Sequence, residues 1–217
     1  AFVARTVALM AGDPAIRFAF ADSRTVHADG TPQWESYKGY YASVEPGALA
    51  RTELFEAEEF VRRFLGVKNL VLNVSAVVWR RDALLAALDA CGEELRGYRM
   101  AGDWRLYLAA LGVPGARVAY QAEPLNVHRR HAESVTHALK ADLHVAEIAR
   151  CHAAAAAVLP APAAAALAPR QAAYLREVAA QLGARLPAEA AATPPASDTR
   201  AAKAGPSDSA SATRSRC

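Results

Sequence analysis

Apolar and polar positions along the chain follow two periods, one typical of helices and one typical of strands. Large apolar side chains at helical spacing predict helices over residues 1–11, 55–65, 82–95, 103–111, 139–159 and 170–183. Shorter apolar runs predict strands over 17–22 and 118–121, and two more runs lie within 70–79. Helices that alternate with strands favour an α/β layer fold.

Turn and cap residues punctuate these segments. Gly12-Asp13-Pro14 ends the first helix, Ala28-Asp29-Gly30 forms a turn, and Asp82 caps the helix that follows it. Residues 31–50 are expected to be irregular and carry four aromatic side chains, Trp34, Tyr37, Tyr40 and Tyr41. Such a cluster could stack on a sugar or form a small satellite of the core.

The composition changes near residue 140 and divides the chain into three parts. Residues 1–137 mix aromatic, aliphatic and charged side chains as a packed domain does, whereas 138–184 form an alanine-rich helical extension. Residues 185–217 contain almost no large apolar side chain. Because such a segment cannot bury enough surface to offset its ordering entropy, we expect a disordered tail.

Bulk properties exclude several function classes. The chain has 217 residues and a net charge of +3, from 25 basic and 22 acidic residues, which is too balanced to indicate a nucleic-acid partner. Three widely spaced cysteines, Cys91, Cys151 and Cys217, indicate a reducing compartment rather than a disulfide framework. We expect no membrane span and no signal peptide, and the absence of an initial Met suggests a fragment.

The first chemically informative segment is Met100-Ala101-Gly102-Asp103-Trp104, at the start of a predicted helix. Asp103 could be a helix-capping acid that is stabilised by the helix dipole. A carboxylate at a junction between a loop and a helix could instead act as a general base towards a sugar hydroxyl. Trp104 could offer a flat face to a sugar ring or belong to the core.

The second segment, residues 124–136, concentrates His128, Arg129, Arg130 and His131 in four consecutive positions. These residues could form a solvated basic loop. They could also bind a diphosphate, because arginine gives bidentate hydrogen bonds to phosphate and histidine can donate to it or ligate a divalent ion.

These two segments, in this order and separated by a short strand, resemble the C-terminal half of the family 2 glycosyltransferases. In that family an acid pair followed by an aromatic residue opens a helix and supplies the catalytic base. Gly102-Asp103-Trp104 matches this element, with Gly102 in place of the first acid. The strand at 118–125 and Arg129-Arg130-His131 match the elements that follow.

The resemblance continues upstream and covers about residues 1–137. Phe18 to Ser23, which includes Asp22, followed by Asp29-Gly30 resembles a strand and turn of the family, and Asn73 to Arg81 resembles the strand that leads into the acceptor side. Asn73, Ser75 and Asp22 could therefore line the substrate cleft. Backbone hydrogen bonding is the alternative for Asn73 and Ser75, and a turn-stabilising role is the alternative for Asp22.

The resemblance implies a partial GT-A (Rossmann-like) domain. It also implies inverting transfer of a sugar from a nucleoside-diphosphate-sugar to a glycan or lipid-linked acceptor, in polysaccharide biosynthesis. Asp103 would be the base. Trp104, Arg129, Arg130, His131, Asp22, Asn73 and Ser75 would bind substrate.

The same resemblance implies a divalent cation, Mn²⁺ or Mg²⁺, with His131 as an extra ligand. The chain contains no Asp-x-Asp metal motif, so the principal ligands and the nucleotide-binding strands would precede Ala1. Location would be cytoplasmic, at the inner face of the membrane.

Two other functions remain open at this point. The chain could be a non-catalytic interaction module whose alanine-rich helices pack on the domain or on a partner through Leu143, Ile148, Val158, Leu175, Val178 and Leu182. A weaker alternative is polyanion binding through the basic segment at 129–131 and basic residues of the tail. The interspersed acidic residues argue against it.

Overall fold

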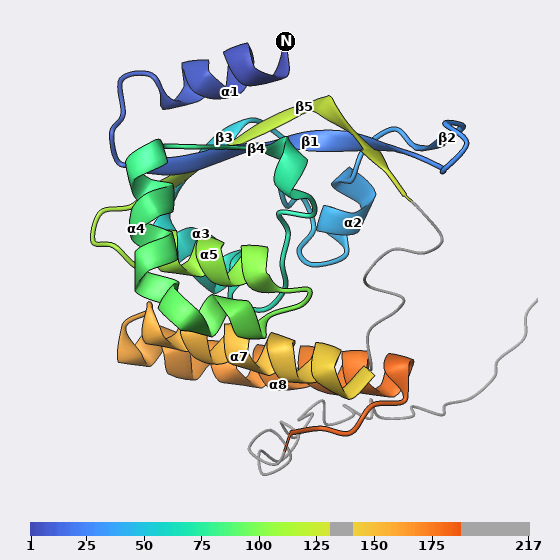
Figure 1. Cartoon of the computed structure of the whole chain (residues 1–217), viewed down its shortest axis with the longest axis vertical. Helices are drawn as coiled ribbons and strands as arrows, with labels where there is room; N and C mark the ends of the chain where they lie inside the picture. The colour runs from blue at the N-terminus through green and yellow to red at the C-terminus, as the bar shows by residue number, and fades with distance from the viewer. Residues whose placement is uncertain (131–140, 188–217) are drawn as a thin grey trace, which may run out of the picture.

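The computed structural model describes residues 1–130 and 141–187, and shows a mixed α/β fold built on one curled sheet (Figure 1). The helices are α1 (Phe2–Met10), α2 (Lys38–Ala42), α3 (Ala57–Phe60), α4 (Arg81–Cys91), α5 (Gly102–Leu111), α7 (Ala141–Ala157) and α8 (Ala161–Leu182). A π-helical turn, η1, spans Val61–Leu65, and two 3₁₀ turns, η2 and η3, span Val74–Ala76 and Gly92–Gly97. The strands are β1 (Ile16–Val26), β2 (Pro32–Trp34), β3 (Glu53–Glu56), β4 (Val77–Trp79) and β5 (Arg117–Arg129).

The sheet is organised around the parallel pair β1 and β5. Its order is β2-β1-β5-β3, and β4 also pairs with β1 in the antiparallel direction. The register of β1 and β5 shifts around Asp22, which lies opposite Pro124. Proline has no N–H to donate, so a register irregularity is where a strand tolerates it.

Helices cover both faces of the sheet. Helix α1 lies over one face, while α4 and α5 lie on the other side, with α7 and α8 beneath them (Figure 1). The core includes Phe18, Phe20, Phe60, Tyr107 and Tyr120, all almost completely buried. At about 25 cal/mol per Å² of apolar surface, aromatic residues of this size contribute much of the burial free energy.

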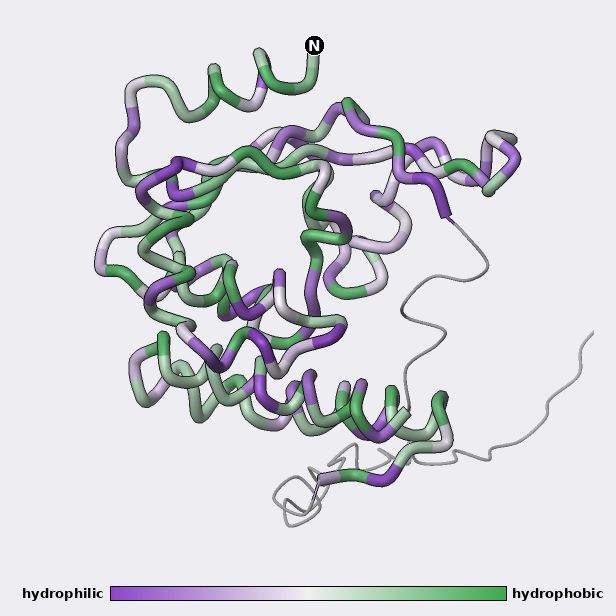
Figure 2. Tube along the Cα trace, viewed as in Figure 1, coloured by the Kyte–Doolittle hydropathy of each residue, from purple (hydrophilic) through white to green (hydrophobic). Residues whose placement is uncertain are grey.

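The alanine-rich helices belong to the same core. Val145, Ile148 and Cys151 of α7 and Leu175 of α8 are buried in the hydrophobic cluster that contains the sheet residues. Gly112 allows a close approach, because a Cβ there would lie 2.7 Å from Val158 Cγ1. The α7–α8 pair is pale green over most of its length in Figure 2, as expected for alanine, and packs as a layer of the domain.

Several predicted elements differ from the observed ones. The helix expected over 55–65 begins at Ala57 because residues 53–56 pair with β5. The segment 31–50 contains β2 and α2 and is not wholly irregular. The strand expected over 118–121 extends to Arg129.

Helix ends and helix lengths also depart from expectation. Asp82 lies in the first turn of α4 and makes no capping hydrogen bond, so its predicted cap role is wrong. Helix α8 starts at Ala161, nine residues before the predicted 170, and continues through Pro169. Within residues 1–130 and 141–187, no helix is both long and apolar enough to cross a bilayer. The expected disordered tail lies outside the described residues from position 188 onward.

Candidate functional site

Asp103 lies in the first turn of α5, where the chain leaves an irregular segment. Its Oδ1 accepts a hydrogen bond from the backbone N–H of Trp104 at 2.7 Å. No capping side-chain bond occurs at Ala101, the residue that precedes the helix. The Asp103 carboxyl therefore contacts a backbone N–H of the first turn, and it is partly buried.

Burial makes the Asp103 carboxyl a weaker acid than an exposed one. Desolvation raises its pKa from 3.8 to about 6, while hydrogen bonds from the Trp104 backbone and the Asn69 side chain act in the opposite direction. Among the causes of the shift that the described residues supply, none is a cation. A carboxyl whose pKa is near neutrality has the acidity of a general base or acid that works at physiological pH.

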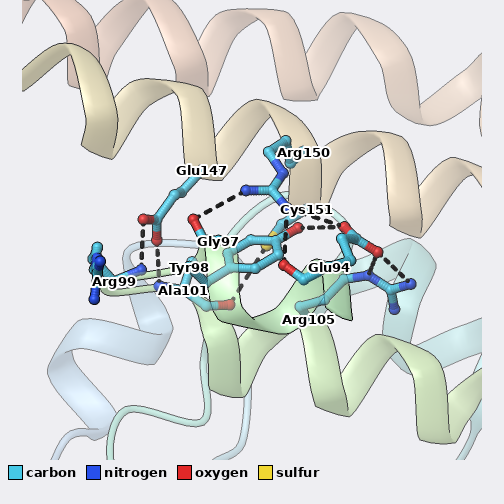
Figure 3. Close-up of polar contacts among 9 residues, drawn as sticks. All are labelled: Glu94, Gly97, Tyr98, Arg99, Ala101, Arg105, Glu147, Arg150 and Cys151. Atoms are coloured by element: carbon cyan, nitrogen blue, oxygen red, sulfur yellow. Dashed lines mark hydrogen bonds and ion pairs between the residues drawn. The ribbon is translucent and has the colours of Figure 1, made fainter. Parts of the chain in front are cut away.

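A buried carboxylate from another helix fixes the segment that leads to Asp103. Glu147 of α7 is 1% exposed and accepts backbone N–H groups from three consecutive residues, of which Figure 3 shows Arg99 and Ala101. The donors are Arg99 at 2.7 Å, Met100 at 2.9 Å and Ala101 at 2.8 Å. Since these are charge-assisted bonds to successive N–H groups, they hold the start of α5 against α7.

Arg150, one turn after Glu147, strengthens the same junction. Its guanidinium lies 3.9 Å from the ring centroid of Tyr98 and donates to the carbonyl oxygen of Gly97 at 3.3 Å (Figure 3). The Cys151 thiol donates to the carbonyl oxygen of Ala101 at 3.7 Å. Three α7 side chains therefore contact residues 97–101 through hydrogen bonds and a cation–π interaction. The position of Asp103, which follows this segment, thus depends on the helical extension.

A second group of polar side chains gathers at the register irregularity of the sheet. Asp22 is completely buried, and its Oδ1 accepts backbone N–H groups from Ser23 and Tyr37 at 2.7 and 3.0 Å. Its Oδ2 accepts the Ser36 hydroxyl. The carboxylate thus ties β1 to the residues that precede α2, and the turn-stabilising alternative describes these contacts.

Asn73, Ser75 and Asn126 complete this group. The Asn73 side-chain amide donates to Ser23 Oγ at 3.1 Å, and its Oδ1 accepts the Ser75 hydroxyl at 2.6 Å and the Asn126 amide at 3.0 Å. Asp22 and the Asn73–Ser75 pair, which lie far apart in the sequence, are therefore joined through Ser23 in one hydrogen-bonded network.

The segment from Asn69 to Asn73 links Asp103 to that network. Asn69 lies beside the Asp103 carboxyl, and Asn73 bonds to Ser23. Four residues of fully extended chain span at most about 14 Å. Asp103 and the network are thus separated by little more than the length of this segment.

Trp104 does not present a face to solvent. It is 3% exposed, its indole Nε1–H donates to the carbonyl oxygen of Leu65 at 2.8 Å, and its ring meets His152 edge-on at 5.8 Å. The prediction that Trp104 stacks on a sugar is corrected by this burial, and the core alternative describes the residue. The contact with His152 places the Trp104 side chain against α7.

His128 and Arg129 of the basic segment belong to β5, and Arg130 directly follows the strand. The Arg129 guanidinium donates to the carbonyl oxygen of Ala28 at 2.9 Å, and that of Arg130 lies 5.4 Å from the ring centroid of Trp34. His128 Nδ1 is bonded to the Tyr37 hydroxyl at 2.7 Å, and burial lowers the pKa of this imidazole. Figure 2 shows the end of β5 in purple, as expected for consecutive polar residues.

His131 lies outside the described residues, so its predicted roles as substrate contact and metal ligand have no structural counterpart here. Among residues 1–130 and 141–187, no group of three His, Cys, Asp or Glu side chains could hold a metal ion.

Sequence reasoning assigned no role to Asn126, Ser36 or Glu147, although Asn126 and Ser36 bond directly to the predicted site residues Asn73 and Asp22. Asn126 and His128 belong to the basic segment that drew attention to Arg129, and only the parallel pairing of β5 with β1 brings them to Ser23 and Tyr37. Glu147 gave no signal, because one acid on an alanine-rich helix is ordinary. No protein-family model, curated protein or solved structure matches the chain.

Proposed function

We propose that the chain is the acceptor-binding part of an inverting glycosyltransferase of the GT-A (Rossmann-like) kind, which transfers a sugar from a nucleoside-diphosphate-sugar to a glycan or lipid-linked acceptor. The observation that carries the proposal is the partly buried Asp103 carboxyl, whose pKa is raised to about 6 and which makes no ion pair with a described residue. A base with this pKa is mostly ionised at neutral pH and still accepts a proton readily.

The proposed reaction is a single displacement. Asp103 takes the proton of the acceptor hydroxyl as that oxygen attacks the anomeric carbon. The bond from this carbon to the diphosphate oxygen breaks, and its electron pair leaves with the nucleoside diphosphate. Because attack and departure occur on opposite faces, the configuration at the anomeric carbon inverts.

The polar network suits a hydroxyl-rich acceptor. Ser23, Asn73 and Asn126 present both donors and acceptors whose positions are fixed by mutual hydrogen bonds of 3.0–3.3 Å. Fixed polar groups of this kind discriminate strongly against a ligand that lacks the matching hydroxyl. We propose Arg129 and Arg130 as diphosphate contacts, and a divalent cation would neutralise the charge of the leaving group when bound. The reaction would take place at the cytoplasmic face of the membrane.

The resemblance of residues 1–137 to family 2, carried by Gly102-Asp103-Trp104 and the segments around it, supports this reading. The interaction-module alternative is less favoured by the packing. Ile148, Leu175 and Val178, three of the apolar side chains that would meet a partner, are buried in the domain core. Leu143 and Leu182 are exposed, but two side chains make a small surface.

The test uses the longest natural protein that contains this chain, incubated with UDP-, GDP- and dTDP-hexoses, Mn²⁺ or Mg²⁺, and a set of oligosaccharide and polyprenyl-linked acceptors. Release of nucleoside diphosphate that depends on the acceptor supports glycosyl transfer. The anomeric coupling constant of the product, measured by NMR, then distinguishes inversion from retention. Failure of every donor to bind in calorimetry would exclude the proposed activity.

A further inference from the structure

An open groove lies between β2 and α2. It has a volume of about 640 Å³ and is lined by Gln33, Trp34, Glu35, Ser36, Gly39 and Tyr40. Small-molecule sites of proteins occupy about 300–1,000 Å³ and combine aromatic walls with a few polar groups. The lining of this groove has that composition, and none of its residues serves as the base or belongs to the basic segment.

Trp34 forms the wall of the groove and is 44% exposed, unlike its aromatic neighbours Tyr37 and Tyr41, which are 4% and 2% exposed. The four aromatic residues of 31–50 therefore separate into two kinds. Tyr37 and Tyr41 belong to the core, as the satellite-core alternative expected, while Trp34 and the partly buried Tyr40 border open space.

Trp34 is held in place by both its backbone and its side chain. The backbone N–H of Trp34 donates to Thr25 Oγ1 at 3.0 Å, and the Thr25 hydroxyl donates to Gln33 Oε1 at 3.2 Å. Its ring meets Tyr37 edge-on at 5.9 Å, and the Arg130 guanidinium lies 5.4 Å from its centroid. A preorganised platform of this kind loses little conformational entropy when a ligand binds.

The floor of the groove is open at Gly39. A Cβ built on this residue would meet no atom within 4 Å, so the space above it belongs to the groove and not to the core. Ser36 lines the groove and also donates its hydroxyl to Asp22. One hydrogen bond thereby links the groove to the polar network described above.

We propose that this groove is a subsite for one pyranose ring of a saccharide acceptor, stacked on Trp34 and hydrogen-bonded by Gln33 and Glu35. A pyranose has a face of C–H groups and a rim of hydroxyl groups, which matches a flat indole bordered by an amide and a carboxylate. The opposite charges of Arg130 and Glu35 suit a neutral ring better than a polyanion. The choice of acceptor as ligand rests on the proposed function, whereas saccharide binding itself does not.

The chain contains three tryptophans, and two of them are internal controls for a binding test. Trp104 is buried with its indole N–H bonded to Leu65, and Trp79 is stacked on Tyr107 at 5.5 Å. In ¹H–¹⁵N spectra of the full chain, methyl glycosides of glucose, galactose, mannose and rhamnose, and their disaccharides, are titrated to millimolar concentration. The indole signal of Trp34 should move with at least one of them, while that of Trp104 stays in place.

Two variants at one position test the site without removing the platform. Gly39→Leu fills the groove and should raise the dissociation constant at least about tenfold, whereas Gly39→Ala leaves the space open and should bind as the wild type does. Trp34→Ala should abolish binding. Equal binding by Gly39→Leu, a shift of Trp34 with uridine or adenosine but with no saccharide, or no shift with any probe would overturn the proposal. Because no donor or turnover enters this test, saccharide binding by a protein without transferase activity would refute the proposed function and leave the subsite standing.

Discussion

Replacing Glu147 with glutamine tests whether α7 fixes the segment that leads to Asp103. The carboxylate accepts three backbone N–H groups at 2.7–2.9 Å while 1% exposed. An amide has one acceptor oxygen, so at best the two N–H groups that now share Oε2 keep a neutral partner, and the Arg99 N–H faces an NH₂ group. Hydrogen bonds to charged groups contribute about 1.5–3 kcal/mol each, and removal of the buried charge offsets part of the loss, so we expect a net destabilisation of about 2–3 kcal/mol.

The assay is equilibrium unfolding in urea at pH 7.5. With a slope of about 2 kcal/mol/M, the midpoint of Glu147→Gln should fall by about 1–1.5 M. Asp142→Asn is the matched control on the same helix, because its ion pair with Arg185 is exposed and should contribute at most about 1 kcal/mol. Amide hydrogen exchange of residues 99–101 should accelerate in Glu147→Gln. An unchanged midpoint with unchanged exchange would refute the role given to this carboxylate.

Two further predictions concern pH, and both follow from buried groups. The folded-state pKa of Asp103 is raised from 3.8 to about 6, so ionisation of this carboxyl lowers the free energy of unfolding as pH rises from 3.8 to 6. Asp103→Asn should therefore raise the free energy of unfolding by about 2 kcal/mol at pH 7.5 and by much less at pH 4. Unfolding in urea at the two pH values measures this difference. Burial lowers the pKa of His152 from 6.5 to about 4, so the stability contributed by the neutral imidazole is present above pH 6.5 and is lost as pH falls towards 4. In the wild type the effects of Asp103 and His152 on stability oppose each other. In Asp103→Asn, the free energy of unfolding should fall as pH is lowered from 6.5 to 4, and adding His152→Gln should remove this fall. A free energy of unfolding that does not change with pH in Asp103→Asn would contradict the assignment of His152.

The sequence predicted the elements of this fold better than their relations. Helical periodicity placed both ends of α5 and the C-terminal end of α7 within two residues of the observed ends, because both helices have an apolar face. The full length of β5 was hidden by Glu123, Pro124 and Asn126, which are atypical of strands. These residues pair with β1 only because the register shifts there, and no local pattern reveals a register shift.

Alanine content was a poor guide to packing. The alanine-rich helices were expected to form an extension, yet small side chains on α8 and Gly66, which faces α8, allow close contact with the domain. A Cβ on Gly66 would lie 2.6 Å from Leu167 Cδ2. Composition reports how much surface a helix can bury per residue but not what it is buried against.

Only those residues of the candidate site that have a local sequence signature could be predicted. Asp103 and the basic segment have local signatures, a helix start and a charge cluster, that a sequence displays directly. The burial that raises the pKa of Asp103 comes from elements distant in sequence and could not be anticipated. Trp104 shows the converse case, since the same short motif that marked the acid also marked a core residue as a ligand contact.

The central claim, that Asp103 is the base of a glycosyl transfer, is tested most directly by turnover of the longest natural protein that contains this chain with its best donor and acceptor. Asp103→Asn should lower kcat at least about 10²-fold with donor affinity unchanged, since general-base catalysis contributes about 10²–10⁴-fold. The exposed carboxylate variant Asp142→Asn should retain wild-type turnover. Near-wild-type kcat in Asp103→Asn would remove this residue from the mechanism and contradict the account.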